Sequence, residues 1–281
     1  MAQSASGPWN RMPISARAIV SGLLVGLIGA NVWSVLLIGL GPRVWAVLAE
    51  VLFLILYLAW TRGIGPPAST GASRREAGRV GQISPTQWAW GLAAAIAFPI
   101  SVHAALVVLF RLTPFPAATF HLGYDLSAAP SATIRWLVIL MAAASAGICE
   151  ETGFRGYLQR PIEARHGPGI AILISAIMFT LFHFNKAWML TGMTPIVFCA
   201  GLLLGLIAWS SRSLIFSMIG HTLMDVGLFA YWWSQIAGVF SARTIFETGV
   251  DPPFMIACAV LVAALAATLA AAWRLARSWP A

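Results

Sequence analysis

The stretch WLVILMAAA, residues 136–144, is an apolar run that leads to two adjacent glutamates, Glu150 and Glu151, and then to Arg155. Such a run is typical of a helix that crosses a lipid bilayer. A carboxylate placed at that depth costs about 3 kcal/mol on insertion scales. Because ionisable groups inside a membrane mark functional sites by default, this glutamate pair is the first candidate site.

The composition of the whole chain describes the same environment. Hydrophobic residues make up 59% of the chain and charged residues 9%, and the mean hydropathy is +0.83. A soluble domain carries about 25% charged residues, so the sequence predicts an all-α, polytopic transmembrane helical bundle. Segments long enough for a span, which needs roughly 20 apolar residues, number about eight: residues 18–40, 44–60, 87–110, 132–151, 169–184, 194–210, 213–235 and 253–273.

The basic residues predict the orientation, because lysine and arginine gather in cytoplasmic segments. With the N-terminus inside, the cytoplasmic segments hold Arg11, Arg17, Arg62, Arg74, Arg75, Arg79, Arg155, Arg160, Arg165, Arg212, Arg274 and Arg277. The other side holds Arg43, Arg111, Arg135, Lys186 and Arg243. Both termini are therefore expected inside. The net charge of +8 is scattered singly between apolar runs, so no nucleic-acid partner is expected. The arginine and alanine bias favours a bacterial cytoplasmic membrane.

Three segments follow from this pattern. Residues 1–131 would form an N-terminal region of three spans with a cytoplasmic Arg/Pro/Gly linker at residues 61–85. Residues 132–235 would form the core that carries the motifs, and residues 236–281 an outer loop and the last span. Two polar residues of the first region lie apart from the motifs: Glu50 could pair with another span, and His103 is expected to be structural.

The first motif is Glu150-Glu151-x-x-x-Arg155. Residues four apart share a helix face, whereas neighbours are rotated by about 100°. Arg155 is therefore placed to form an ion pair with Glu151, and Glu150 points into another sector and stays available.

The second motif is Phe179-x-x-x-His183. His166-Gly167-Pro168-Gly169 is a strong turn signal, and Glu150 and His183 lie about equally far before and after it. At 1.5 Å per residue both would lie about 24 Å from the tip of a helical hairpin. Equal depth on neighbouring helices is what a shared site requires.

The third motif is His221-x-x-x-Asp225, a pair that faces one way on a helix. His221 lies about 14 Å from the turn at residues 210–212. It matches the depth of the first two motifs only if the hairpin between the fourth and fifth spans protrudes into the cytoplasm.

In this order the motifs resemble the CPBP family of intramembrane endopeptidases, which includes the type II CAAX prenyl proteases and bacteriocin-immunity (Abi) proteins. The family pattern is E-E-x-x-x-R, F-x-x-x-H and H-x-x-x-N or -D on three helices of an eight-helix bundle. The resemblance covers residues 132–230. It implies that Glu150 and His183 activate a water and that His221 and Asp225 stabilise the oxyanion.

Asp225 leaves two options, because an ionised carboxylate only accepts hydrogen bonds. It is either protonated and donates to the oxyanion, or ionised and orients His221 as the third member of a triad does. Glu150, His183, His221 and Asp225 also match the ligand preferences of zinc. Because the chain has no H-E-x-x-H pair, the spacing favours a mechanism without a metal cofactor.

The resemblance implies a substrate that is a membrane-associated protein or a lipidated peptide. Two functions from other classes remain open. Glu, His and Asp at mid-depth also form the proton relays of transporters, although no internal repeat of the kind that transporters show was found. A catalytically silent membrane adaptor is the third hypothesis.

Overall fold

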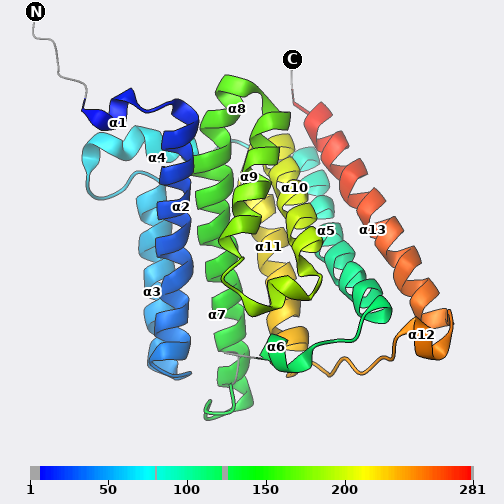
Figure 1. Cartoon of the computed structure of the whole chain (residues 1–281). Coiled ribbons are helices and arrows are strands. Elements are labelled where there is room, and N and C mark those ends of the chain that lie inside the picture. The colour runs from blue at the N-terminus through cyan, green and yellow to red at the C-terminus, as the bar shows by residue number, and fades with distance from the viewer. Residues whose placement is uncertain (1–6, 80, 122–125, 280–281) are drawn as a thin grey trace, which may run out of the picture.

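Every regular element is a helix in the part of the chain that the computed structural model describes, residues 7–79, 81–121 and 126–279 (Figure 1). The long helices are α2 (Ile14–Trp33), α3 (Val44–Thr61), α5 (Pro85–Leu112), α7 (Ala132–Glu151), α9 (Pro168–Phe182), α10 (Met193–Ser211), α11 (Ile215–Gly227) and α13 (Pro252–Arg277). Short helices are α1 (Pro8–Arg11), α4 (Gly71–Ala77), α6 (Ala117–His121), α8 (Arg160–His166) and α12 (Ile245–Thr248). The π-helical segments η1 (Ser34–Gly39), η3 (Thr152–Gln159) and η5 (Leu228–Trp233) extend α2, α7 and α11. The all-α prediction is confirmed.

Each of the eight predicted spans has a helix in its place, but the helices are not equally suited to a bilayer. Six are long and apolar enough to cross a membrane in the described residues. The other two are α9, with 15 residues, and α11, whose polar side chains lower its hydropathy. These two helices carry the second and third motifs. Each buries one face in the bundle, and α9 keeps an exposed apolar face with Ile170, Leu173 and Leu181.

Polar residues define where several spans begin. Ser84 accepts a hydrogen bond from the Gln87 backbone and the Gln87 side chain accepts one from Ser84, which forms a capping box at the start of α5. Ser131 and Asp251 cap α7 and α13 in the same way with one side-chain contact each. Such caps satisfy backbone N–H groups that have no partner within the helix.

The fourth span is longer than the sequence predicted. We expected it to end at Glu151, but one helical run of 35 residues continues from Ala132 to His166. The π-helical segment η3 lies in this continuation, and Arg155 is fully buried within it. Arg155 therefore does not belong to a cytoplasmic turn, and the sequence assigned it to the wrong environment. Local π-helical turns are frequent at functional sites.

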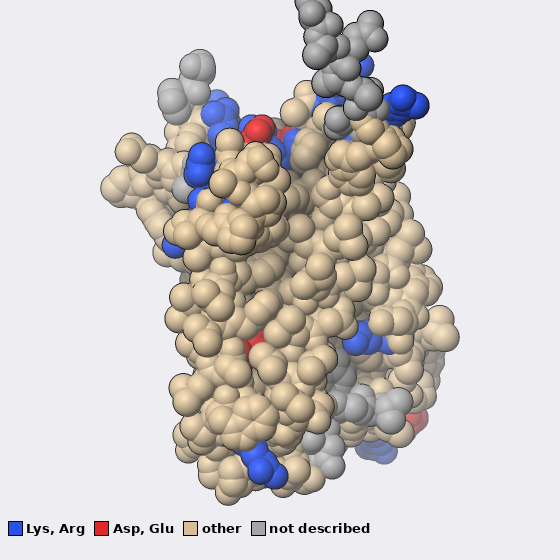
Figure 2. Space-filling model, turned by 90° about the vertical axis from the view of Figure 1, so that its left-hand side faces the viewer, with Lys and Arg blue, Asp and Glu red and all other residues tan. Residues whose placement is uncertain are grey.

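The long helices alternate in direction, so both ends of the described chain lie at the same end of the bundle (Figure 1). The arginines that the sequence placed on the cytoplasmic side, apart from Arg155, lie at or beside this end of the helices. On the face shown in Figure 2, basic side chains gather most densely at this end, and a broad, mostly uncharged belt lies below it, with acidic atoms visible near its middle and further basic side chains toward the other end. This distribution is that of an integral membrane protein, and the orientation of the basic end toward the cytoplasm stays a prediction.

Helix α7 and its extension η3 pack against α2 through glycines, which let two backbones approach closely. A Cβ atom built on Gly153 would lie 2.6 Å from the carbonyl oxygen of Gly22 and 2.7 Å from Cα of Gly26. Distances this short leave no room for a methyl group. The contact therefore sets the position of the segment that bears the first motif.

Gly153→Ala should lower the stability of the protein, because the added methyl group forces α2 away from η3; overpacking of this kind costs about 1–3 kcal/mol. The midpoint of thermal unfolding of the purified protein in detergent measures the effect. Gly169→Ala is the matched control, since a Cβ there meets nothing within 4 Å and alanine favours a helix. Equal midpoints for the two variants would contradict the close-packing account.

Candidate active site

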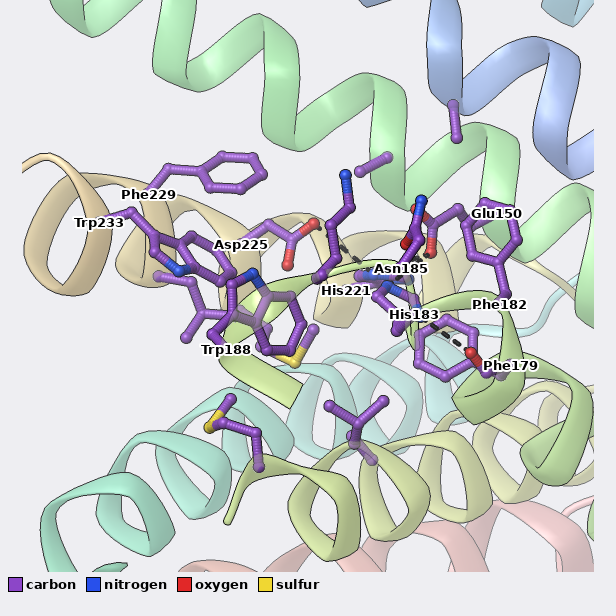
Figure 3. Close-up of a pocket in the computed structure, with 18 of the residues that line it drawn as sticks. Glu150, Phe179, Phe182, His183, Asn185, Trp188, His221, Asp225, Phe229 and Trp233 are labelled. Atoms are coloured by element: carbon purple, nitrogen blue, oxygen red, sulfur yellow. Dashed lines mark hydrogen bonds and ion pairs between the residues drawn. The ribbon is translucent and has the colours of Figure 1, made fainter. Parts of the chain in front are cut away.

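The three motifs meet at one cavity of about 270 Å³ inside the bundle. Glu150 comes from α7, His183 from the C-terminal cap of α9, and His221 and Asp225 from α11 (Figure 3). The predicted equal depth of Glu150 and His183 is confirmed by their contact. The third motif reaches the same depth, and α8 forms the tip of the hairpin at the basic end of the bundle (Figure 1).

Glu150 presents a buried oxygen atom to both imidazoles. Its Oε2 lies 3.8 Å from His183 Nε2 and 3.9 Å from His221 Nε2. This oxygen has no hydrogen-bond partner in the described part of the chain, and the glutamate is only 6% exposed. Buried polar atoms are almost always satisfied. Polar atoms separated by more than about 3.5 Å are often bridged by water, so this arrangement suits one bound water.

A backbone carbonyl of α9 determines the tautomer of His183, and the nitrogen that faces Glu150 is the one that can accept a hydrogen bond. His183 Nδ1 lies 2.8 Å from the carbonyl oxygen of Phe179. Because a carbonyl only accepts, Nδ1 donates the proton, and in the neutral ring Nε2 carries a free lone pair. A water between Nε2 and the Glu150 carboxylate can then donate one hydrogen to each, which leaves its oxygen lone pair free for attack.

Glu151 has a contact that the sequence did not reveal. Its Oε1 lies 2.8 Å from Arg155 Nη1, as predicted, and also 2.9 Å from Nδ1 of His221. Glu151 and Arg155 are fully buried, and His221 is almost fully buried. A carboxylate held by an arginine accepts from the imidazole, so Glu151 orients His221 and directs its Nε2 toward the cavity.

Arg155 connects the motifs to their surroundings. Its Nη2 donates to the carbonyl oxygen of Gly201 on α10 at 3.0 Å, and its guanidinium lies over the Phe179 ring at 4.6 Å. Phe179 in turn stacks near His183 and His221, with ring centroids at 4.6 and 5.7 Å. The motif phenylalanine therefore packs between the buried cation and the two imidazoles.

Asp225 lies on the far side of His221 from Glu151. Its Oδ2 is 3.6 Å from His221 Nε2, beyond hydrogen-bond distance, and the side chain lines the cavity. The orienting contact to His221 is made by Glu151 at Nδ1 rather than by Asp225. This geometry favours the first of the two options for Asp225, a group that faces the substrate.

A metal site was the alternative for these four residues. Among the described residues, no group of three or more His, Cys, Asp or Glu side chains is arranged to hold a metal ion. The role of a metal therefore stays open to experiment.

Aromatic side chains form the other wall of the cavity, and the sequence did not assign them to the site. Phe229 and Trp233 lie beyond Asp225, on the side away from Glu150 (Figure 3), and the Trp188 ring lies between Trp233 and His183, with centroids at 5.5 and 6.0 Å. The residues after His183 also line the cavity: Asn185 and Lys186, the only lysine in the chain.

The two separate polar residues of the N-terminal region have partners outside the site. Glu50 on α3 accepts a short hydrogen bond from Ser145 on α7, so the expected pairing with another span is confirmed. His103 on α5 accepts a hydrogen bond from Trp232 at 3.2 Å, which fits its expected structural role.

Arg155→Ala should strongly reduce the amount of folded protein, because it leaves the Glu151 carboxylate buried beside a single imidazole. Removal of one partner of a buried ion pair costs about 3–5 kcal/mol. Abundance in membranes and the unfolding midpoint measure the loss. Arg165→Ala on α8 is the control, since Arg165 is exposed and its loss should leave both unchanged. Normal stability of Arg155→Ala with lost activity would instead assign Arg155 to the chemistry.

Comparisons with known proteins agree with the motifs. Residues 132–227 match the family model described as type II CAAX prenyl endopeptidase Rce1-like. Comparison with curated proteins and with solved structures gave no match. The matched residues contain all three motifs and the helices that carry Glu150, His183, His221 and Asp225. The resemblance that the motifs indicated is therefore confirmed over residues 132–227, less than half of the chain, which are similar to the Rce1-like type II CAAX prenyl endopeptidases.

Proposed function

We propose that the protein is an intramembrane endopeptidase that hydrolyses a peptide bond of a membrane-associated substrate with a water activated by Glu150 and His183. The observation that carries the proposal is the buried Glu150 Oε2, which has no hydrogen-bond partner among the residues that the structure describes and lies at nearly equal distances from two imidazoles. The family match supports a substrate of the CAAX type, a prenylated protein cut near its C-terminus.

The first step is attack by water. With one hydrogen on Glu150 and the other on His183 Nε2, the water oxygen points into the cavity. Its attack on the substrate carbonyl carbon forms the C–O bond while Glu150 takes the proton as general base. His183 keeps its Nδ1 proton on the Phe179 carbonyl throughout, so the ring holds the water without changing its orientation.

The second step is stabilisation of the oxyanion. As an imidazolium, His221 donates from Nδ1 to Glu151 and from Nε2 into the cavity. A protonated Asp225 supplies the second donor beside it. Donors held in place before the reaction contribute the largest electrostatic part of such catalysis. Collapse of the intermediate breaks the C–N bond, and Glu150 returns its proton to the departing amine.

The cavity walls support an apolar substrate. Tryptophan and phenylalanine side chains bury large apolar area, and Trp188, Phe229 and Trp233 surround the space beside the polar groups. A peptide with a lipid or apolar side chain could lie against them while its carbonyl faces Glu150.

The substrate can be sought directly. Membranes of cells that produce the Glu150→Ala protein should accumulate an uncleaved protein that is absent when the wild type is present, and mass spectrometry of protein C-termini identifies it. A farnesylated CAAX peptide and its unprenylated counterpart, incubated with the purified protein, test whether the lipid is required. Cleavage of neither, together with no accumulating protein, would contradict the proposed function.

Glu150→Ala and His183→Ala should each lower cleavage by at least about 100-fold, the contribution of a positioned acid or base. The double variant should be no slower than the slower single variant, because a base and the partner that shares its water act as a unit. Rates are measured on the identified substrate, with membrane abundance as the folding control. More than a few per cent of residual activity in either single variant would exclude that residue as a water activator.

Asp225→Asn separates the three roles considered for this residue. Asparagine keeps the size and is a neutral donor, so cleavage should remain near the wild-type rate if Asp225 donates to the oxyanion. If a carboxylate is needed to orient His221, the rate should fall by about 10⁴, as in a triad. If Asp225 binds a metal, bound metal should fall together with activity. Activity lost to a chelator and restored by zinc would contradict the metal-free mechanism.

A further inference from the structure

A second cavity lies at the basic end of the bundle, away from the candidate active site. Its volume is about 650 Å³, larger than that of the active-site cavity. It is enclosed by the segment after α4, by α8, and by the C-terminal ends of α10 and α13. Four of its lining residues are arginines and two are tryptophans: Arg75, Arg79, Arg160, Arg212, Trp209 and Trp279.

One wall of this cavity is a fixed cation. Arg79 is 7% exposed, and its Nη2 lies 2.7 Å from Glu163 Oε2. Its Nε donates to the carbonyl oxygen of Arg155 at 3.3 Å. The guanidinium is thus held against the extension of α7, and Glu163 is already engaged by it.

The remaining charge in the cavity is positive and accessible. Glu163 and Glu76 are the acidic residues of the lining, so the four arginines leave a formal excess of two positive charges. Arg75 and Arg212 are exposed side chains. Neither forms an ion pair with an acidic side chain in the described residues.

Tryptophan gives the cavity an amphipathic edge. Trp279 Nε1 donates to the carbonyl oxygen of Ser210 at 2.9 Å, which joins the C-terminal segment to the end of α10. The guanidinium of Arg212 lies over the Trp279 ring at 5.0 Å. Tryptophan is enriched where headgroups meet acyl chains, so this edge has the composition that suits a lipid headgroup.

We propose that this cavity binds the phosphate headgroup of an anionic membrane phospholipid. Arginine forks match phosphate oxygens in pairs, and basic pockets between helices on the cytoplasmic side are suited to anionic headgroups. Arg75 and Arg212 supply the free donors, Arg79 the fixed positive wall, and the tryptophans the apolar edge for the lipid's glycerol and chains. The proposal is independent of peptidase activity.

Native mass spectrometry of the purified full chain in detergent tests the proposal. The Glu150→Ala protein is used throughout. Dioleoylphosphatidylglycerol should bind with a stoichiometry near one, at least tenfold more tightly than dioleoylphosphatidylcholine, which has the same chains and no net charge. Arg75→Gln/Arg212→Gln should weaken binding of the anionic lipid at least tenfold.

The matched control is Arg62→Gln/Arg165→Gln, which removes two exposed arginines from the same end but outside the cavity. It should change the affinity less than twofold. Both double variants must keep the elution volume and the unfolding midpoint of the parent protein. If Arg75→Gln/Arg212→Gln unfolds, Arg75→Glu/Arg212→Glu replaces it. Equal weakening by the control pair would overturn the site, because general surface charge would then explain the binding.

Competition distinguishes the source of the phosphate. Short-chain dihexanoylphosphatidylglycerol should displace the bound lipid at concentrations where inorganic phosphate does not. Displacement by inorganic phosphate at the same concentration would overturn the lipid part of the proposal and assign the cavity to free phosphate. Equal binding of the anionic and zwitterionic lipids would overturn the selectivity for negative charge.

Discussion

The buried ion pair of Glu151 and Arg155 is the constraint on which the core of this protein depends. Both side chains are fully buried. A charge left there without its partner would strongly lower the stability of the folded protein. Each partner therefore recruits further contacts: Glu151 accepts from His221 on α11, and Arg155 donates to Gly201 on α10. The aromatic face of Phe179 on α9 covers the guanidinium. One pair of charges thus determines how three neighbouring helices meet the extended α7.

The same pair explains why adjacent glutamates have different environments. Glu151 uses its carboxylate for structure, while the next side chain is rotated by about 100° and faces the cavity. Within the described part of the chain, Glu150 Oε2 consequently lies among polar groups without a direct hydrogen-bond partner. The polar groups of the three motifs come from helices, or in the case of His183 from a helix cap, that are held by buried contacts. Preorganised donors and acceptors of this kind are what water activation in a bilayer would need.

The length of the α7 run connects two regions at different depths. Near its middle it carries Glu150, and near its end it carries Glu163, which holds Arg79 at the wall of the basic cavity. Arg79 also donates to the backbone carbonyl of Arg155. A continuous helix therefore places the candidate active site inside the apolar belt and the arginine-lined cavity at its edge. The glycine contact with α2 fixes the helix between them.

Much of the fold could be predicted because apolar length and helical period are local properties. The eight helices, the three motifs and the Glu151–Arg155 pair follow from residue spacing alone, since i and i+4 positions share a face. The shared depth of Glu150 and His183 followed from the turn at residues 166–169. The contact of His221 with Glu151 could not be predicted, because it depends on how α11 is rotated against α7.

The tertiary structure alone decided the features that depend on packing between distant segments. The helix of α7 continues past Glu151 and packs against α2 through close glycine contacts, so Arg155 is buried and not in a turn. The aromatic wall joins Trp188 to Trp233 across a long stretch of chain, and the basic cavity joins Arg75 to Arg212 and the C-terminal Trp279. Spacing along the chain determines which residues share a helix face. Only the packed bundle determines which faces meet.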